Sequence, residues 1–148
     1  HILSEVGSAT LVCRLREGAC LDWRRVVPTG SPIKLVANVS DFAQSVERVG
    51  LIVSEKNKSP VRCVFSNQEV QMRTSNTLGA AEDKCSFAGD GQETEIGFNV
   101  KYLIEALRAV PSEEVTLELT NGLSPIVLTP VDKKYDFAYM VLPVRIKG

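Results

Sequence analysis

The sequence has almost no histidine and no apolar run long enough to cross a membrane. His1 is the only histidine in 148 residues, which nearly excludes a Ser-His-Asp or Cys-His catalytic arrangement. A membrane-spanning helix needs about 20 mostly apolar residues, and no segment approaches that length. A basic stretch followed by an apolar one, as in a secretory signal, is also missing at the start. Catalysis by a histidine-dependent triad and insertion into a membrane are therefore both unexpected.

Motifs of common enzymes and metal sites are missing as well. There is no Walker loop and no G-x-G-x-x-G, and Gly89-Asp90-Gly91 is interpreted as a turn. The acidic pairs Glu82-Asp83 and Glu113-Glu114 have no partners at the spacing of a metal site, so both are interpreted as solvated surface. We expect no catalytic residue, no cofactor and no metal.

The cysteines do not form a zinc motif. None of the four belongs to a C-x-x-C pair; they are Cys13, Cys20, Cys63 and Cys85. Cys13 and Cys63 lie inside apolar, strand-like runs, where we expect each to be a buried, reduced thiol that acts as a small hydrophobe. Four free cysteines predict a cytoplasmic protein.

Neither sign of charge predominates. Seventeen basic residues against eighteen acidic ones give a formal net charge of −1. Proteins that hold DNA by neutralising phosphates usually have a clear basic excess. We therefore do not expect the isolated chain to bind DNA tightly.

The chain divides at a segment rich in turn-forming residues. Residues 28–32 contain two prolines, a glycine and two hydroxyl side chains, which is typical of a linker. Before it, Ala9–Leu15 and Asp22–Val27 resemble strands. Residues 1–27 are too few for a core of their own, so we expect them to be the edge of something larger. Residues 33–148 are long enough for a complete domain.

The domain after the linker begins with a strand and a helix. Ile33–Ala37 is strand-like, and a helix is predicted from near Ser40-Asp41, with Ser40 as its N-cap. Phe42, Val46 and Val49 share one face of this helix. The strands predicted after it are Val61–Ser66, Glu69–Arg73 and Lys84–Phe87.

The same order of elements then recurs. A strand at Glu93–Gly97 leads to a helix capped by Asn99 and ended by Pro111. Its apolar face consists of Leu103, Ala106, Leu107 and Val110, and the strands predicted after it are Val115–Leu119, Ile126–Thr129 and Ala138–Ile146. Two strand-helix-strand-strand-strand units indicate an α+β fold with a pseudo-twofold repeat and helices on one face of an antiparallel sheet.

Four segments connect the chain to a known family. They are Asp22–Pro28 (DWRRVVP), Glu95–Leu103 (EIGFNVKYL), Leu119–Pro125 (LTNGLSP) and Tyr139–Ile146 (YMVLPVRI). Their order and spacing along the whole chain resemble the bacterial sliding clamp, the beta subunit of DNA polymerase III. Members of that family have three similar domains, each a twofold pseudo-repeat with helices on the inner wall of a ring and sheets outside. The resemblance implies a fragment, with residues 1–27 ending the second domain, 28–32 as linker and 33–148 as the third domain.

The resemblance also implies a function. Sliding clamps are non-catalytic processivity factors of bacterial DNA replication, and their homodimeric rings encircle double-stranded DNA with weak contacts. They dock polymerase subunits, the clamp loader and repair proteins through short peptide motifs. Encirclement does not require tight phosphate binding, so the near-zero net charge is compatible with it. The alternative is a free-standing, clamp-like peptide-binding module that never encircles DNA.

A peptide-binding groove is implied between the second and third domains. The matching positions are Arg25, Val26, Asn99, Tyr102, Leu123, Met140, Leu142, Pro143, Val144 and Arg145. Aliphatic walls would receive Leu or Phe side chains, and the polar groups would fix the peptide's orientation. Alternatively, Met140, Leu142 and Val144 are core residues of an amphipathic strand, although both faces of that strand are apolar.

Two more surfaces follow from the resemblance. Arg48, Lys101 and Arg108 would face DNA, although on sequence alone they belong to ordinary solvent-exposed helix faces of mixed charge. For ring closure, Leu51 and Ile52 would contact apolar residues of the neighbouring protomer, and Glu82 and Asp83 would meet its basic ones.

Two features depart from the family pattern near the groove, and the C-terminus is longer. Leu21 stands where relatives often have proline, and Asn57 and Lys58 stand near a position where some have an aromatic residue. Lys147-Gly148 extends past the usual end. We expect the first two to bear on peptide preference, and the extension lies close to the groove.

Overall fold

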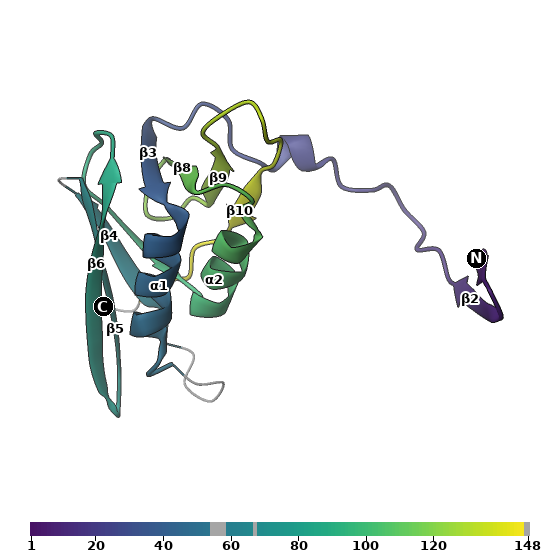
Figure 1. The fold of residues 1–148 in the computed structure, drawn as a ribbon, viewed down its shortest axis with the longest axis horizontal. Coiled ribbons are helices and arrows are strands. Elements are labelled where there is room, and N and C mark those ends of the chain that lie inside the picture. The colour runs from purple at the N-terminus through teal and green to yellow at the C-terminus, as the bar shows by residue number, and fades with distance from the viewer. Residues whose placement is uncertain (54–58, 67, 147–148) are drawn as a thin grey trace.

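The structure is a computed structural model that describes residues 1–53, 59–66 and 68–146. Asn57, Lys58 and the Lys147-Gly148 extension lie outside the described residues. In the described part, an eight-stranded sheet and two α-helices form the domain, and a separate two-stranded hairpin lies at the N-terminal end. Figure 1 shows this hairpin at the far end of an extended segment, away from both helices.

The N-terminal segment has no core. Strands β1 (Ile2–Val6) and β2 (Ala9–Cys13) pair antiparallel, and residues 1–26 are all exposed. Cys13 is therefore exposed, and the expectation that it is buried is wrong. The predicted strand at Asp22–Val27 is also wrong, because Trp23–Arg25 forms a short 3-10 helix, η1. Asp22 Oδ1 accepts a hydrogen bond from the Arg24 N–H at 3.2 Å, a local bond that favours a turn over a strand.

The two repeats are present in the predicted order. The first consists of β3 (Ile33–Asn38), α1 (Val39–Gly50), β4 (Val61–Ser66), β5 (Glu69–Asn76) and β6 (Gly79–Ala88). The second consists of β7 (Thr94–Phe98), α2 (Val100–Ala109), β8 (Glu114–Leu119), β9 (Ile126–Pro130) and β10 (Tyr139–Val141). The α+β fold with a strand-helix-strand-strand-strand repeat is confirmed.

The sheet joins the repeats by exchanging their first strands. Its order is β10-β9-β8-β3-β6-β5-β4-β7, and every pairing is antiparallel. Strand β3 pairs with β8 of the second repeat, and β7 pairs with β4 of the first. Each half of the sheet therefore contains one strand from the other repeat.

The helices lie side by side and bury the faces that their periodicity predicts (Figure 1). Phe42, Val46 and Val49 of α1 and Leu103 and Leu107 of α2 are all buried in the core. These side chains join the inward residues of the strands in one hydrophobic cluster. The core thus fixes both helices against the sheet and leaves their polar faces outside.

The helix starts follow from two asparagines. Asn38 Oδ1 accepts a hydrogen bond from the Asp41 N–H at 3.0 Å, so α1 begins one residue before the predicted cap. Ser40 was the wrong choice of cap; its hydroxyl instead accepts a bond from the Gln44 side chain at 2.9 Å. Asn99 caps α2 as predicted, through the Lys101 N–H at 3.0 Å.

Candidate functional site

Strand β7 anchors the end of the chain, residues 142–146, here called the C-terminal segment. The ladder of β10 stops at Val141, earlier than the predicted end at Ile146, and Pro143 carries no N–H to continue it. The Val144 N–H then donates to the Gly97 carbonyl at 2.7 Å. A Cβ on Gly97 would lie 2.7 Å from the Val144 carbonyl oxygen. Only glycine at this position lets the C-terminal segment approach β7 so closely.

The same strand also supports the turn at residues 121–124. Asn121 Oδ1 accepts hydrogen bonds from the Leu123 N–H at 2.9 Å and from the Ser124 hydroxyl at 3.1 Å. Gly122 lies directly against the Glu95 carbonyl, where a Cβ would clash. Glu95 is two residues before Gly97, or about 7 Å along the strand. β7 therefore brings the turn and the C-terminal segment close together.

An exposed apolar strip runs along the end of the chain. Val141 is 4% exposed and faces the core, whereas its neighbour Leu142 is 64% exposed. Val144 is exposed too, and Met140 and Pro143 are half-buried. The alternative in which Met140, Leu142 and Val144 are core residues is therefore wrong for Leu142 and Val144. The apolar residues on the outer face of this terminal strand are therefore exposed to solvent.

Two further exposed side chains belong to the elements around this strip. Leu123, at the tip of the turn, is 83% exposed, and Tyr102, in the first turn of α2, is 60% exposed. Helix α2 is tied to β10 because the Tyr139 hydroxyl donates to the Ala109 carbonyl at 3.1 Å. Asn99, in contrast, uses its side-chain oxygen to cap α2. We use the name apolar strip for Tyr102, Leu123, Met140, Leu142, Pro143 and Val144.

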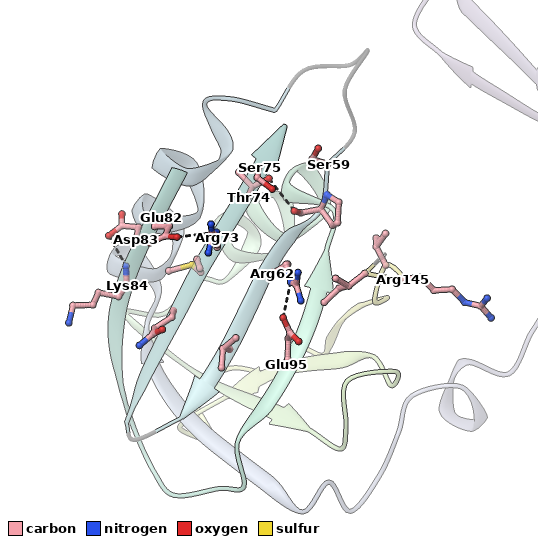
Figure 2. Close-up of a pocket in the computed structure, with 16 residues that line it drawn as sticks. Ser59, Arg62, Arg73, Thr74, Ser75, Glu82, Asp83, Lys84, Glu95 and Arg145 are labelled. Atoms are coloured by element: carbon pink, nitrogen blue, oxygen red, sulfur yellow. Dashed lines mark hydrogen bonds and ion pairs between the residues drawn. The ribbon is translucent and has the colours of Figure 1, made fainter. Parts of the chain in front are cut away.

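The polar residues expected at the groove are accessible. Arg25 and Val26 are exposed at η1, and Arg25 has only a loose ion pair with Asp22, at 3.7 Å. Arg145 points away from the sheet (Figure 2). Within the described part of the chain, Arg145 makes no ion pair. Both guanidinium groups are thus available to a ligand.

A broad hollow of about 1470 Å³ lies on the other side of the C-terminal segment, over the outer face of β4–β7. Figure 2 shows it crossed by two ion pairs, Arg62–Glu95 at 2.8 Å and Arg73–Glu82 at 3.0 Å. Of the expected groove residues, only Val144 and Arg145 line it. Val144 is thus the one member of the apolar strip that borders this hollow.

The three cations expected to face DNA each have a carboxylate partner. Arg48 pairs with Asp83 at 2.5 Å and Arg108 with Glu47 at 2.8 Å. Lys101 approaches Glu105 at 4.0 Å, one helical turn away. The exposed helix faces therefore present little unbalanced positive charge.

The expected ring-closing residues lie at one end of the molecule. Leu51 is 82% exposed just past α1. Ile52 is half-buried, and its carbonyl accepts a hydrogen bond from the Asn76 side chain at 2.6 Å. Leu78, at the tip of the β5–β6 hairpin, is 83% exposed. Sequence reasoning missed Leu78, although a lone leucine between turn residues was a signal. It adds an apolar side chain to this end of the domain.

Glu82 and Asp83 lie on opposite faces of β6. Glu82 pairs with Arg73 over the outer face, and Asp83 pairs with Arg48 on the side of α1. The Arg48 guanidinium holds the pKa of Asp83 below its ordinary value. On the outer face, the Lys84 ammonium similarly lowers the pKa of Glu69. The two acidic residues therefore do not form one cluster.

All four cysteines are free, and two lie within the domain. Burial raises the pKa of the Cys63 thiol far above its ordinary value. Burial also raises the pKa of Cys85 to about 11, with a further contribution from Asp41. Both thiols are therefore protonated and poorly nucleophilic at neutral pH. Among the described residues, no group of three or more His, Cys, Asp or Glu side chains is arranged to hold a metal ion.

The fold and the order of its motifs agree with a known family. The family model for the C-terminal domain of the DNA polymerase III beta subunit matches residues 24–145. The chain belongs to this family, the bacterial sliding clamps. A curated beta sliding clamp from Staphylococcus epidermidis is 31% identical over 148 residues, which is 98% of this chain but 39% of that protein. The chain thus spans about two fifths of the length of the relative it matches.

Solved sliding clamps have the same fold. The DNA polymerase III beta subunit of Pseudomonas aeruginosa superposes with a TM-score of 0.85 at 28% identity, over 97% of this chain and 39% of that one. The sliding clamp of Bartonella birtlesii bound to griselimycin gives a TM-score of 0.85 at 27% identity, over 97% of this chain and 38% of that one. The family predicted from the four segments is confirmed. None of the described helices has the length and apolarity to span a membrane.

Proposed function

We propose that this chain is the C-terminal part of a bacterial sliding clamp. Residues 1–27 end the second domain, 28–32 form the linker and 33–148 are the third domain. The exposed apolar side chains of the N-terminal hairpin support this division, among them Ile2, Leu3, Leu11 and Val12. An isolated two-stranded hairpin is only marginally stable in water, so these side chains need the remaining strands of their own domain.

In the complete protein, this domain closes a homodimeric ring around double-stranded DNA. The ring is a non-catalytic, cytoplasmic processivity factor of the replicative polymerase. Paired cations on the exposed helix faces suit this role, since each unpaired Lys or Arg that binds a phosphate would hold the ring in place. Ring closure uses Leu51 and Ile52 together with the free edge of β6.

The second role is to dock other proteins through short peptides. The apolar strip carries this proposal because it combines exposed aliphatic side chains with two available guanidinium groups, Arg25 and Arg145. Exposed apolar patches with polar rims commonly mark interaction sites. The ligands are peptides of the Gln-Leu-x-Leu-Phe kind from polymerase subunits, the clamp loader and repair proteins.

The strip should bind such a peptide weakly in this chain. Burying a Leu and a Phe side chain contributes about 3–6 kcal/mol, and ordering the peptide consumes much of that. Part of the groove wall belongs to earlier strands of the second domain. We therefore expect a micromolar Kd at best for residues 1–148 and tighter binding by the complete protein.

Fluorescence anisotropy with a labelled Gln-Leu-x-Leu-Phe peptide tests the docking role. Substituting Met140→Asp and Leu142→Asp together places two charges on the strip and should abolish binding. Glu47→Gln and Arg108→Gln alter the helix faces only and should leave the Kd unchanged. If the double Asp variant is folded and binds like the parent, the strip is not the docking site.

A further inference from the structure

Arg48 and Asp83 were expected to serve different partners, DNA and a neighbouring protomer, yet they bind each other. Arg48 Nε donates to Asp83 Oδ2 at 2.5 Å, and a terminal nitrogen of Arg48 donates to the Ser45 hydroxyl at 2.9 Å. The second Asp83 oxygen accepts the backbone N–H of Lys84 at 2.8 Å. Both oxygens of Asp83 and two nitrogens of Arg48 are thus engaged within the domain.

The strand that carries Asp83 has a free edge. β6 pairs with β5 along residues 79–86, but on its other side it meets β3 only through Phe87 and Ala88. Residues 79–86 therefore present unpaired backbone groups on one side, as judged from the described strands. Such an edge is a template for pairing with another chain. Along residues 79–86, β6 is held by its pairing with β5 and by its contact with α1.

The Arg48–Asp83 ion pair is a tie between α1 and this free edge. Asp83 has 22% side-chain exposure and Arg48 has 56%, so the carboxylate is the more enclosed partner. The neighbouring residue Glu82 pairs with Arg73 on the opposite face. An unpaired Asp83 would leave a partly enclosed negative charge beside the edge, which disfavours close approach of another strand.

We propose that Arg48 is a positioning residue for ring closure, which holds the free edge of β6 through Asp83, and that it does not contact DNA. This inference rests on the proposed function, because it requires that the complete protein closes a ring. Arg48 sets the distance between α1 and β6 and neutralises Asp83. The neighbouring protomer then meets a strand whose backbone groups are aligned and whose inner carboxylate is already paired.

The chain offers a matched control for this proposal. Arg108 forms an ion pair with Glu47 at 2.8 Å. The side chains of this pair are 68% and 39% exposed, somewhat more than those of Arg48 and Asp83. That pair joins α2 to α1 and involves no residue of β6. Substituting either arginine removes one positive charge from the same helix layer. A difference between the two variants therefore reports the contact with β6 and not the charge.

The experiment uses the complete protein that contains this chain. Donor-labelled and acceptor-labelled rings are mixed, and energy transfer appears as opened rings exchange protomers. The rate at which this signal rises reports the rate of ring opening. Arg48→Gln should open about three- to tenfold faster than the parent, the range expected for losing one well-aligned ion pair, and Asp83→Asn should do the same. The double variant should be no faster than either. Arg108→Gln should match the parent, and Arg48→Asp with Asp83→Arg should recover most of the loss.

Three results would overturn the inference while rings still form. Arg48→Gln could open at the parent's rate, its effect could add to that of Asp83→Asn, or the swapped pair could fail to recover. Hydrogen exchange gives a local readout: amides 79–86 should exchange faster in Arg48→Gln while those of β8 do not change. Equal acceleration in both strands would mean a general loss of stability and would also contradict the proposal.

DNA binding separates the two roles of Arg48. The slope of log K against log salt should be the same for the parent and Arg48→Gln. A slope smaller by about one would mean that Arg48 neutralises a phosphate, which contradicts the inference. If the parent itself forms no closed ring, the proposed function fails first, and the two failures are thereby distinguished.

Discussion

Gly97→Ala is the sharpest single perturbation of the candidate groove. A methyl group there would lie 2.7 Å from the Val144 carbonyl oxygen and 2.8 Å from Ile146 Cγ1. The first contact is with backbone, so the strand or the C-terminal segment must move. Overpacking of this kind costs about 1–3 kcal/mol, and the lost Val144–Gly97 hydrogen bond adds about 1 kcal/mol. The C-terminal segment is at the edge of the sheet, so its displacement is the cheaper response.

We therefore expect Gly97→Ala to stay folded but lose peptide affinity. Its Tm should fall by about 5–15 °C. Its Kd for the Gln-Leu-x-Leu-Phe peptide should rise at least about tenfold, because Leu142, Pro143 and Val144 of the apolar strip move with the C-terminal segment. Gly91→Ala is the control, since the three atoms nearest to its methyl would all belong to the Ile33 side chain and none to backbone. It should lower the Tm without changing the Kd. Parent-like binding by a folded Gly97→Ala protein would refute the reasoning.

Two further outcomes are expected. Light scattering of residues 1–148 should show a monomer or a non-native association through the exposed edge, and a stable ring-like dimer would contradict this. Asp83 has a lowered pKa in the folded state, so its stabilising effect is complete above the ordinary Asp pKa of about 3.9 and is lost as the pH falls through the lower, folded-state value. In denaturant titrations, Arg48→Gln should thus have a lower free energy of unfolding than the parent at pH 7, and this difference should narrow towards pH 3. A difference that does not change with pH would contradict the role of Arg48 in lowering the pKa of Asp83.

The elements that the sequence predicted well are those whose local signals agree with their burial. Helix α2 carries an asparagine cap, an apolar face and a proline just beyond its end, and the structure has all three. Strand β4 was predicted at Val61–Ser66, where alternate residues point inward, and those are its observed bounds.

The errors occur where a side chain competes with the backbone or where tertiary contact decides. Asp22–Val27 contains β-branched and aromatic residues, but the Asp22 side chain bonds to the backbone and turns the chain. Strand β10 ends early because of Pro143 and because the Val144 N–H bonds to the Gly97 carbonyl, a contact between residues distant in sequence. The pairing of Arg48 with Asp83 spans 35 positions, and no periodicity could have indicated it.

The measurement that tests the central claim most directly is retention on circular DNA. The complete protein, loaded by its clamp loader onto nicked circular DNA, should stay bound through gel filtration at high salt, where phosphate contacts are screened. Cutting the circle once should release it, because a ring can then slide off the ends. Release from the intact circle at high salt, or retention after linearisation, would contradict the account of a ring that holds DNA by encirclement.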